Sequence, residues 1–452
     1  MLRMSVTARG KSRAGIGSAV ALALALASGA AAGTAVLATP AFAQRIPPPA
    51  ERGQAPAPQP QPQQQRPQDG ASLSRSFQPV YQAVANATNT TGDLAAAKAQ
   101  VPAMVAAIGS EYDRFFAGNI LLQLGAKSSD RALQKQGLEL MLASGRASPA
   151  DTGLFHYYIG GIAYDSGDYE SARRALQASI AAGFQGNFAE RQDPWGMMAD
   201  AYVRQGQVQE ALQFYKTTVA QRRAAGQAIP EPWLVQALGI AYEQRQASEA
   251  LEWAALLVEV SPTETNWQRA LQVVNAVALS DDQVRLDLYR LMALTNALKE
   301  RGDFNRYIDA ADARIMANEV ARVLDAGLRA GAFTASDDYY TMVKTVVDER
   351  APVDRREAPS LAAEARSAAG TGRDAQNAGD VFLSLGSHAE AEEMYALGLQ
   401  KGGGDRDRLL TRLGIAQVHQ GKLADAKAAF AQVSGERAGV ARMWTAYIDS
   451  RA

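Results

Sequence analysis

The chain has 452 residues, a formal net charge of −1 and no cysteine. Because this length exceeds one ordinary globular core, we expect several domains or an elongated array. The near-neutral charge shows no bias toward nucleic acid or an anionic membrane surface. The lack of cysteine excludes disulfides, zinc thiolates, iron–sulfur clusters and thiol nucleophiles.

Residues 1–43 are predicted to be a Sec-type secretory signal peptide. Basic residues precede the stretch AVALALALASGAAAGTAVLA, and Ala41 and Ala43 match an A-x-A cleavage site. An uncleaved anchor is the alternative, since a spanning helix needs about 20 apolar residues. The weakly apolar Ala/Gly composition favours cleavage after Ala43, and no cysteine offers a lipid attachment point. We therefore expect a periplasmic or secreted chain with no integral membrane span after cleavage.

Residues 44–72 form a Pro/Gln-rich segment. Proline has no amide donor and fixes φ, and the segment holds little apolar bulk to bury. We predict a disordered, extended linker. A proline-rich ligand for a partner domain is the alternative.

From about Leu73 onward the chain shows helical periodicity, which is clearest in DPWGMMADAYVRQGQVQEALQFYKTTV, residues 193–219. The positions that share the first helical face are Trp195, Met198, Ala199 and Tyr202. Gly206 then tolerates the positive φ that often ends a helix. A second face of the same period contains Ala211 and Tyr215. The stretch predicts a helical hairpin, which must bury its apolar faces against neighbouring hairpins.

The same pattern recurs along the chain. Ala172, Ala211 and Ala250 are spaced 39 and 39 residues apart, and Gly386 and Gly421 near the C-terminus are 35 residues apart. Five units are recognisable, at 156–180, 193–219, 233–262, 378–399 and 413–433. No alternating β pattern is present, so we predict an all-α protein.

This pattern resembles the tetratricopeptide repeat family, whose unit of about 34 residues places Trp, small, Tyr, Gly and Ala residues at set positions. The resemblance implies a right-handed superhelix, a solenoid of helical hairpins in which the small positions mark close helix–helix approach. Some units depart from the pattern. His156 takes the Trp position, and Gln246 or its neighbour replaces the turn glycine in the third unit.

We predict three structured regions on this basis. Residues 73–331 form an N-terminal helical array, and residues 332–372 form a helical, flexible connection in which Pro352 and Pro359 act as breakers. Residues 373–452 form a C-terminal repeat pair, closed by a capping helix at 438–450.

The chemistry of the chain favours no enzyme, cofactor or metal. His156, His388 and His419 have no histidine partner at i+3 or i+4, so we interpret each as a packing or groove residue. The glycine clusters lack the ending of a phosphate-binding loop. A lysozyme-like lytic enzyme is a poor fit, because the Glu-Ser catalytic stretch of that class is missing.

The family resemblance also implies exposed positions on the first helix of each unit, lining a concave groove. These candidate groove residues are Tyr157, Tyr164, Asp165, Asp200, Arg204, Trp233, Gln236 and Glu243. The alternative is that the aromatic residues among them pack against adjacent helices. We predict a non-enzymatic exported scaffold that binds proteins or peptides in the cell envelope. The alternative is a periplasmic scaffold that binds glycan or exopolysaccharide.

Overall fold

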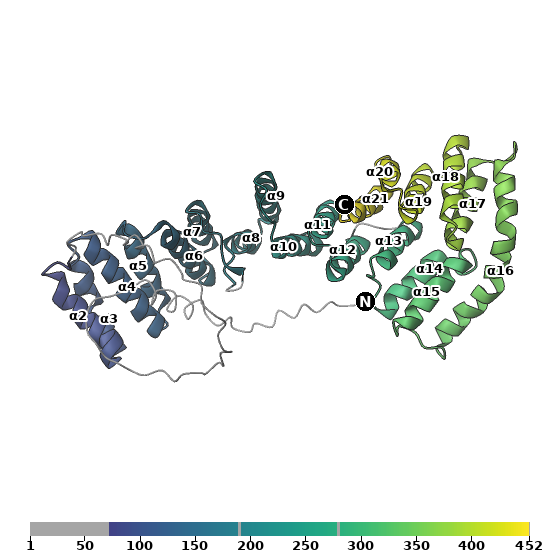
Figure 1. Cartoon of the computed structure of the whole chain (residues 1–452). Helices are drawn as coiled ribbons and strands as arrows, with labels where there is room; N and C mark the ends of the chain where they lie inside the picture. The colour runs from purple at the N-terminus through teal and green to yellow at the C-terminus, as the bar shows by residue number, and fades with distance from the viewer. Residues whose placement is uncertain (1–71, 189–190, 278–280, 452) are drawn as a thin grey trace, which may run out of the picture. The chain divides into compact units, whose positions relative to one another are not determined.

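The computed structural model describes residues 72–188, 191–277 and 281–451, and Figure 1 shows their helices in chain order. The predicted signal peptide, and all but the last residue of the predicted linker, lie outside these ranges. Within them the protein is helical, and the only β pairing is an isolated bridge between Asn187 and Gln192. The predicted all-α solenoid class is confirmed.

The chain divides into two compact units, one up to Gly206 and one from Gln207 onward. This boundary falls inside the range 73–331, which we predicted as one array. The helices of the N-terminal unit are α2 (Phe77–Asn86), the π-helical turn η1 (Ala87–Thr91), α3 (Leu94–Ala106), α4 (Glu111–Lys127), α5 (Arg131–Ala143), α6 (Pro149–Asp165), α7 (Tyr169–Ala181) and α8 (Pro194–Arg204).

The C-terminal unit contains the remaining helices. They are α9 (Val208–Ala224), α10 (Glu231–Glu243), α11 (Ala247–Val260), α12 (Glu264–Val277), α13 (Asp282–Leu294), α14 (Arg301–Ala311), α15 (Ala317–Arg329), α16 (Asp338–Arg366), α17 (Gly372–Leu385), α18 (His388–Lys401), α19 (Arg406–His419), α20 (Leu423–Phe430) and α21 (Arg437–Asp449). No helix in the described ranges combines the length and apolar character needed to cross a bilayer.

Helix starts follow from local side-chain chemistry. Ser110, Asp130, Ser148 and Asp168 each accept a hydrogen bond from a backbone N–H in the first turn of the helix that follows. Such caps satisfy amide groups that have no partner inside the helix. Each cap therefore sets where one helix of a hairpin begins.

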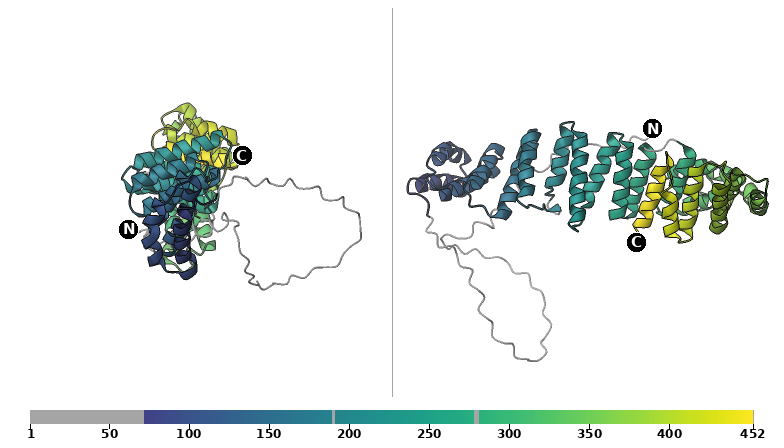
Figure 2. Two further views of the ribbon diagram at one scale, coloured as in Figure 1. Left: turned by 90° about the vertical axis from the view of Figure 1, so that its left-hand side faces the viewer. Right: turned by 90° about the horizontal axis from the view of Figure 1, so that it is seen from above.

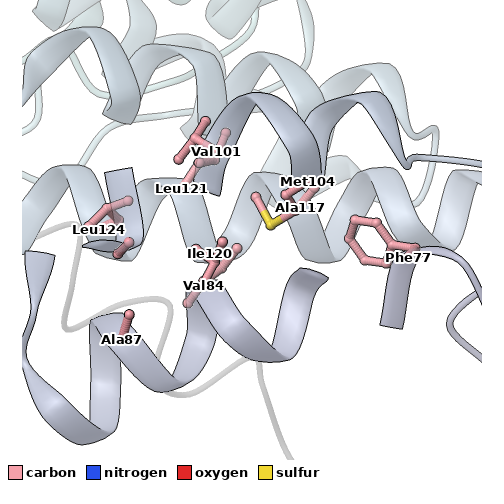
Figure 3. Packing of buried hydrophobic residues seen from close by; sticks show 10 residues of the cluster. Phe77, Val84, Ala87, Val101, Met104, Ala117, Ile120, Leu121 and Leu124 are labelled. Carbon is pink, nitrogen blue, oxygen red and sulfur yellow. The ribbon is translucent and has the colours of Figure 1, made fainter. Parts of the chain in front are cut away.

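The first helices of the N-terminal unit enclose an apolar core, shown in Figure 3. Phe77 and Val84 from α2, Met104 from α3, and Ile120 and Leu124 from α4 are buried in it. Side chains from three successive helices thus share one core, which is how stacked hairpins bury the faces that a single hairpin leaves open.

The turn glycines adopt the predicted conformation. Gly167, Gly206, Gly386 and Gly421 have φ of 80°, 75°, 81° and 75°. In the third repeat, where the sequence lacks this glycine, Arg245 takes the left-handed conformation with φ of 52°. The hairpin geometry is therefore kept at that turn by a residue that tolerates it less well.

Close helix approach is confirmed at most of the small positions. A Cβ on Gly160, Gly379 or Gly414 would lie 2.8, 2.6 or 2.5 Å from a neighbouring side chain. In the 233–262 unit the residue seven positions before the turn residue Arg245 is Leu238, and a Cβ on its neighbour Gly239 would meet nothing within 4 Å. Small size is therefore required at Gly160, Gly379 and Gly414.

Helix α16 differs from our expectation for residues 332–372. Pro352 and Pro359, which we expected to break the helix, both lie inside it. The two prolines are seven residues apart and exposed, whereas Ala351, Ala358 and Ala362 are buried. The alanine face packs against the neighbouring helices, and water reaches the face where proline removes a backbone donor.

The last helix, α21, packs on its predecessors α19 and α20 and also on much earlier helices of its unit. It contacts α11 and α13, and the rings of Tyr447 and Trp267 in α12 lie 6.0 Å apart. The indole Nε1 of Trp444 donates to the backbone oxygen of Asp287 at 3.0 Å. Figure 2 shows the yellow C-terminal helices beside the teal and green helices of the same unit.

Candidate functional site

Three of the predicted groove residues form one hydrogen-bonded group in the N-terminal unit, which we call the polar ladder (Tyr164, Asp200 and Arg204). The hydroxyl of Tyr164, near the end of α6, donates to the carboxylate of Asp200 in α8. Arg204 Nε donates to the same carboxylate at 3.4 Å. Near the ladder, Asp165 pairs with Arg131 of α5 at 3.2 Å.

The polar ladder faces solvent. Tyr164 and Asp200 are half-buried and Arg204 is exposed. Ion pairs in such positions contribute little to stability, about 0–1 kcal/mol. The ladder is therefore a fixed display of donors and acceptors, and it is not a major source of folding energy.

Two of the predicted groove residues are buried. Tyr157 is 3 % exposed and Trp233 is 1 % exposed. The Tyr157 ring lies 5.6 and 5.3 Å from those of Tyr158 and Phe184, and the Trp233 ring lies 6.4 Å from that of Tyr215. Both therefore act as packing residues, as the alternative interpretation held: Tyr157 packs against the segment after α7, and Trp233 packs against α9.

The other predicted residues of the C-terminal unit are accessible. Gln236 is half-buried and accepts a hydrogen bond from the Tyr215 hydroxyl at 2.9 Å. Glu243 is exposed at the end of α10. The eight predicted residues thus divide between the two units, and the polar ladder is the largest group of them that the structure brings into contact.

The C-terminal unit contains a concave pocket of about 420 Å³ that we did not predict from the sequence. Helices α13, α14, α15, α17, α18 and α19 contribute to its lining. Its polar lining residues are Arg290, Tyr307, Glu319, Arg322, His388 and His419. They span 130 positions of the sequence, counted from 290 to 419, so no short motif marks the pocket.

A buried network of ion pairs shares Arg290 and Glu319 with the pocket lining, and Asp287 of α13 pairs with three of its arginines. Its carboxylate pairs with Arg290 at 2.6 Å, with Arg412 of α19 at 3.1 Å, and with Arg437 of α21. Burial raises the pKa of Asp287, but the charges of Arg412, Arg290 and Arg437 outweigh burial and lower the pKa to about 2. The carboxylate is therefore ionised in the folded protein.

A second buried carboxylate, Asp380 of α17, extends the network. It pairs with Arg412 and Arg408 at 2.6 Å each, and it accepts a hydrogen bond from the Tyr395 hydroxyl at 2.8 Å. Burial raises the pKa of Asp380, yet the two arginines lower it overall. Arg412 thus bridges Asp287 and Asp380, and so connects α13 with α17.

The third carboxylate, Glu319 of α15, lies in the pocket wall. Arg290 donates to both of its oxygens, at 2.8 and 2.7 Å, and the Tyr307 hydroxyl donates at 2.8 Å. Breaking such a pair leaves an uncompensated charge in the interior, so the partners hold one another in place. Part of the pocket lining is therefore held in position before any ligand binds.

The pocket also contains a histidine pair. The rings of His388, at the start of α18, and His419, at the end of α19, stack at 4.3 Å with an interplanar angle of 5°. Desolvation and then the His388 ring lower the pKa of His419 to about 4, and desolvation also lowers the pKa of His388. A spacing of i+3 or i+4 cannot indicate this pair, because its two members lie on different helices. Antiparallel packing of consecutive helices is the signal that brings these two ends together.

The histidine pair has no set of metal ligands around it. Among the described residues, no group of three or more His, Asp or Glu side chains could hold a metal ion. His156, the remaining histidine, is half-buried in α6, and burial lowers its pKa.

No protein-family model and no curated protein matches the chain. Among solved structures, a complex of Naa15 and Naa10 bound to HypK-THB matches with a TM-score of 0.40 and 15% identity, over 78% of this chain and 57% of that chain. The chain therefore spans little more than half of that protein. The C-terminal part of a TPR repeat-containing protein from Cytophaga hutchinsonii matches with a TM-score of 0.25 and 12% identity, over 66% of this chain and 98% of that chain. The class of protein, an all-α solenoid of helical hairpins, rests on the helices and packing described above.

Proposed function

We propose that this protein is a non-enzymatic scaffold that is exported to the cell envelope and binds a protein or peptide segment through the polar ladder. The observation that carries the proposal is that Asp200 of α8 accepts hydrogen bonds from both Tyr164 of α6 and Arg204 of α8. These positions are the ones at which the family resemblance places groove residues.

The polar ladder has free capacity for a partner. The Nη groups of Arg204 make no hydrogen bond within the described part of the chain, and a carboxylate such as Asp200 accepts more than two bonds. A peptide segment offers matching main-chain donors and acceptors. Because the helices hold the ladder in advance, binding requires little ordering of the scaffold.

The glycan alternative has less support than protein binding. It depended on Trp and Tyr rings that could stack on sugar faces. Tyr157 and Trp233 are buried, so neither ring offers an open face. Tyr164 is the one accessible ring among the eight predicted residues.

Export rests on the sequence of residues 1–43 and is tested directly. The chain is expressed in a Gram-negative bacterium, and the N-terminus of the recovered protein is read by mass spectrometry. A mature form that begins at Gln44 in the periplasmic or secreted fraction is expected. A full-length cytoplasmic protein would contradict export.

Partner binding is tested by photo-crosslinking in cells. A benzoylphenylalanine residue replaces Val203, which leaves the polar ladder intact, and the matched control replaces Gln177, an exposed residue of α7. We expect a discrete protein adduct from position 203 and none from position 177, and we expect Asp200→Ala to reduce the yield at 203. Equal adducts at 203 and 177 would contradict the proposal, and a carbohydrate adduct at 203 would favour the glycan alternative.

A further inference from the structure

The pocket of the C-terminal unit also has an apolar wall, whose residues take no part in the ion-pair network. Leu294, Leu298, Val323, Leu383 and Ile415 line it together with the polar residues named above. Its volume of about 420 Å³ lies in the range of small-molecule sites, roughly 300–1,000 Å³. The wall can therefore take an apolar body of limited size.

One cation in the pocket retains unused donors. Arg322 of α15 is exposed, and its Nη1 donates to the backbone oxygens of Asn318 and Ser384, at 3.1 and 2.8 Å. Its Nε and Nη2 make no hydrogen bond to any described residue. The two carbonyls orient the guanidinium, which leaves donors of the kind that bind a carboxylate.

The charge balance of the pocket favours an anion. Its charged lining residues are Arg290, Arg322 and Glu319, which sum to +1. Glu319 is already matched by Arg290 and Tyr307, so it does not compete for Arg322. In the buried ion-pair network, Asp287 and Asp380 pair with three further arginines. These arginines are Arg408, Arg412 and Arg437, and the five charges sum to +1.

We propose that this pocket binds a small amphipathic monocarboxylate, such as a medium-chain fatty acid. The carboxylate pairs with Arg322, and the apolar chain lies on Leu294, Val323 and Ile415. Arg290 already uses its nitrogens on Glu319 and Asp287, so Arg322 is the one arginine of the lining with unused donors, and a second anionic group would find no partner in this largely apolar site. This site lies in the C-terminal unit and stands independently of partner binding at the polar ladder.

Isothermal titration calorimetry on the purified full-length mature chain tests the proposal. Octanoate is the probe, with 1-octanol as the apolar body without charge and acetate as the charge without the apolar body. We expect one octanoate site per chain and at least about tenfold weaker binding of both controls, because each lacks one half of the recognition. Absence of octanoate binding, or octanol binding of equal strength, overturns the proposal.

Three variants then locate the site. Arg322→Leu removes the anion partner, and Arg329→Leu is the matched control, since Arg329 is exposed on the same helix and lies outside the pocket lining. Ala326→Phe keeps Arg322 and fills the apolar wall. We expect Arg322→Leu and Ala326→Phe each to weaken octanoate binding about tenfold or more, and Arg329→Leu to leave it unchanged.

Circular dichroism shows whether each variant keeps its helical content. If Arg322→Leu fails to fold, Ala326→Phe carries the decision alone. Octanoate affinity that is the same in Ala326→Phe and in Arg329→Leu would show that the ligand binds elsewhere and would overturn the assignment.

Discussion

Asp287 has no exposed surface and pairs with three arginines. The stability of the C-terminal unit therefore depends on single charged groups. Carboxylates and guanidinium groups lose hydration when buried, and only close pairing offsets that loss. Removal of Asp287 leaves Arg437 without a carboxylate partner among the described residues, and it leaves Arg290 with Glu319 alone and Arg412 with Asp380 alone. These residues are therefore where single substitutions should have their largest effects.

Asp287→Asn is expected to lower the free energy of unfolding by about 3–5 kcal/mol, since three arginines then lack their shared anion. Urea denaturation followed by circular dichroism measures the loss. The matched control is Asp282→Asn on the same helix, whose side chain is 78% exposed and pairs only with Arg285. This control should change stability by less than about 1 kcal/mol. Equal effects of the two substitutions would contradict a structural role for the network.

Protonation of His419 should make the stability of the protein depend on pH, because desolvation favours the neutral ring in the folded state. Its pKa in the folded protein is about 4, below the ordinary value near 6.5, so the unfolded chain binds more protons between these pH values. The stability that neutral His419 contributes is fully present above pH 6.5 and is lost as the pH falls toward 4. NMR titration of the ring resonances gives the pKa, and a midpoint near 6.5 would contradict the stacked arrangement.

At the scale of helices, local sequence signals and packing act together. Turn glycines could be recognised in the sequence because each acts within a few residues of the helix end. The burial of Tyr157 and Trp233 could not, because the same helical period suits a groove residue and a residue wedged between neighbouring helices. The continuation of α16 through two prolines could not be predicted either. Its alanine face stabilises the helix only when α15 and α17 pack against it.

Glycine-to-alanine substitutions separate local helix propensity from packing between helices. A Cβ on Gly118 in α4 would lie 2.5 Å from the backbone oxygen of Gly137 in α5, whereas a Cβ on Gly239 in α10 would meet nothing within 4 Å. We expect Gly118→Ala to destabilise the protein by about 1–3 kcal/mol through overpacking. Gly239→Ala should stabilise it by about 0.5–1 kcal/mol through its helix propensity. Thermal unfolding measures both, and a gain in stability for Gly118→Ala would contradict the close α4–α5 contact.

Ala211 tests the register of the repeat. It is fully buried in α9, at the small position that the 39-residue spacing identifies. Ala211→Leu is expected to cost about 1–3 kcal/mol, because three additional carbon atoms must fit a filled space. Gln213→Leu, at an exposed position of the same helix, is the control. An unchanged melting temperature for Ala211→Leu would count against the assigned register.

At the scale of the whole molecule, each compact unit has its own organisation. The C-terminal unit is closed by α21, which carries Arg437 to Asp287 and Trp444 to the backbone of α13. A terminal repeat helix ordinarily covers only its neighbour. Here the last helix also stabilises helices that lie about 150 residues earlier in the chain, at Asp287.

Trp444→Ala is therefore expected to destabilise α13 together with α21, by about 3–5 kcal/mol for the loss of a buried Trp. Hydrogen–deuterium exchange measures it as faster exchange of the amides of α11, α13 and α21. Arg442→Ala on the same helix, whose side chain is 52% exposed, should leave exchange unchanged. Faster exchange confined to α21 would show that the helix acts only as a terminal cap.

The sequence by itself determined the helices, their hairpin turns, the all-α class and the small positions of the repeat. These depend on helical period, caps and left-handed glycines, which act over a few residues and are written in neighbouring letters. The tertiary structure decided the histidine pair, the ion network, the pocket and the return of α21 onto α13. Many of their contacts join groups on separate helices, up to more than 150 positions apart, such as the rings of His388 and His419, or the indole of Trp444 and the backbone of Asp287. Their meeting depends on how successive hairpins rotate as they stack, a small angle at each step that no local pattern specifies.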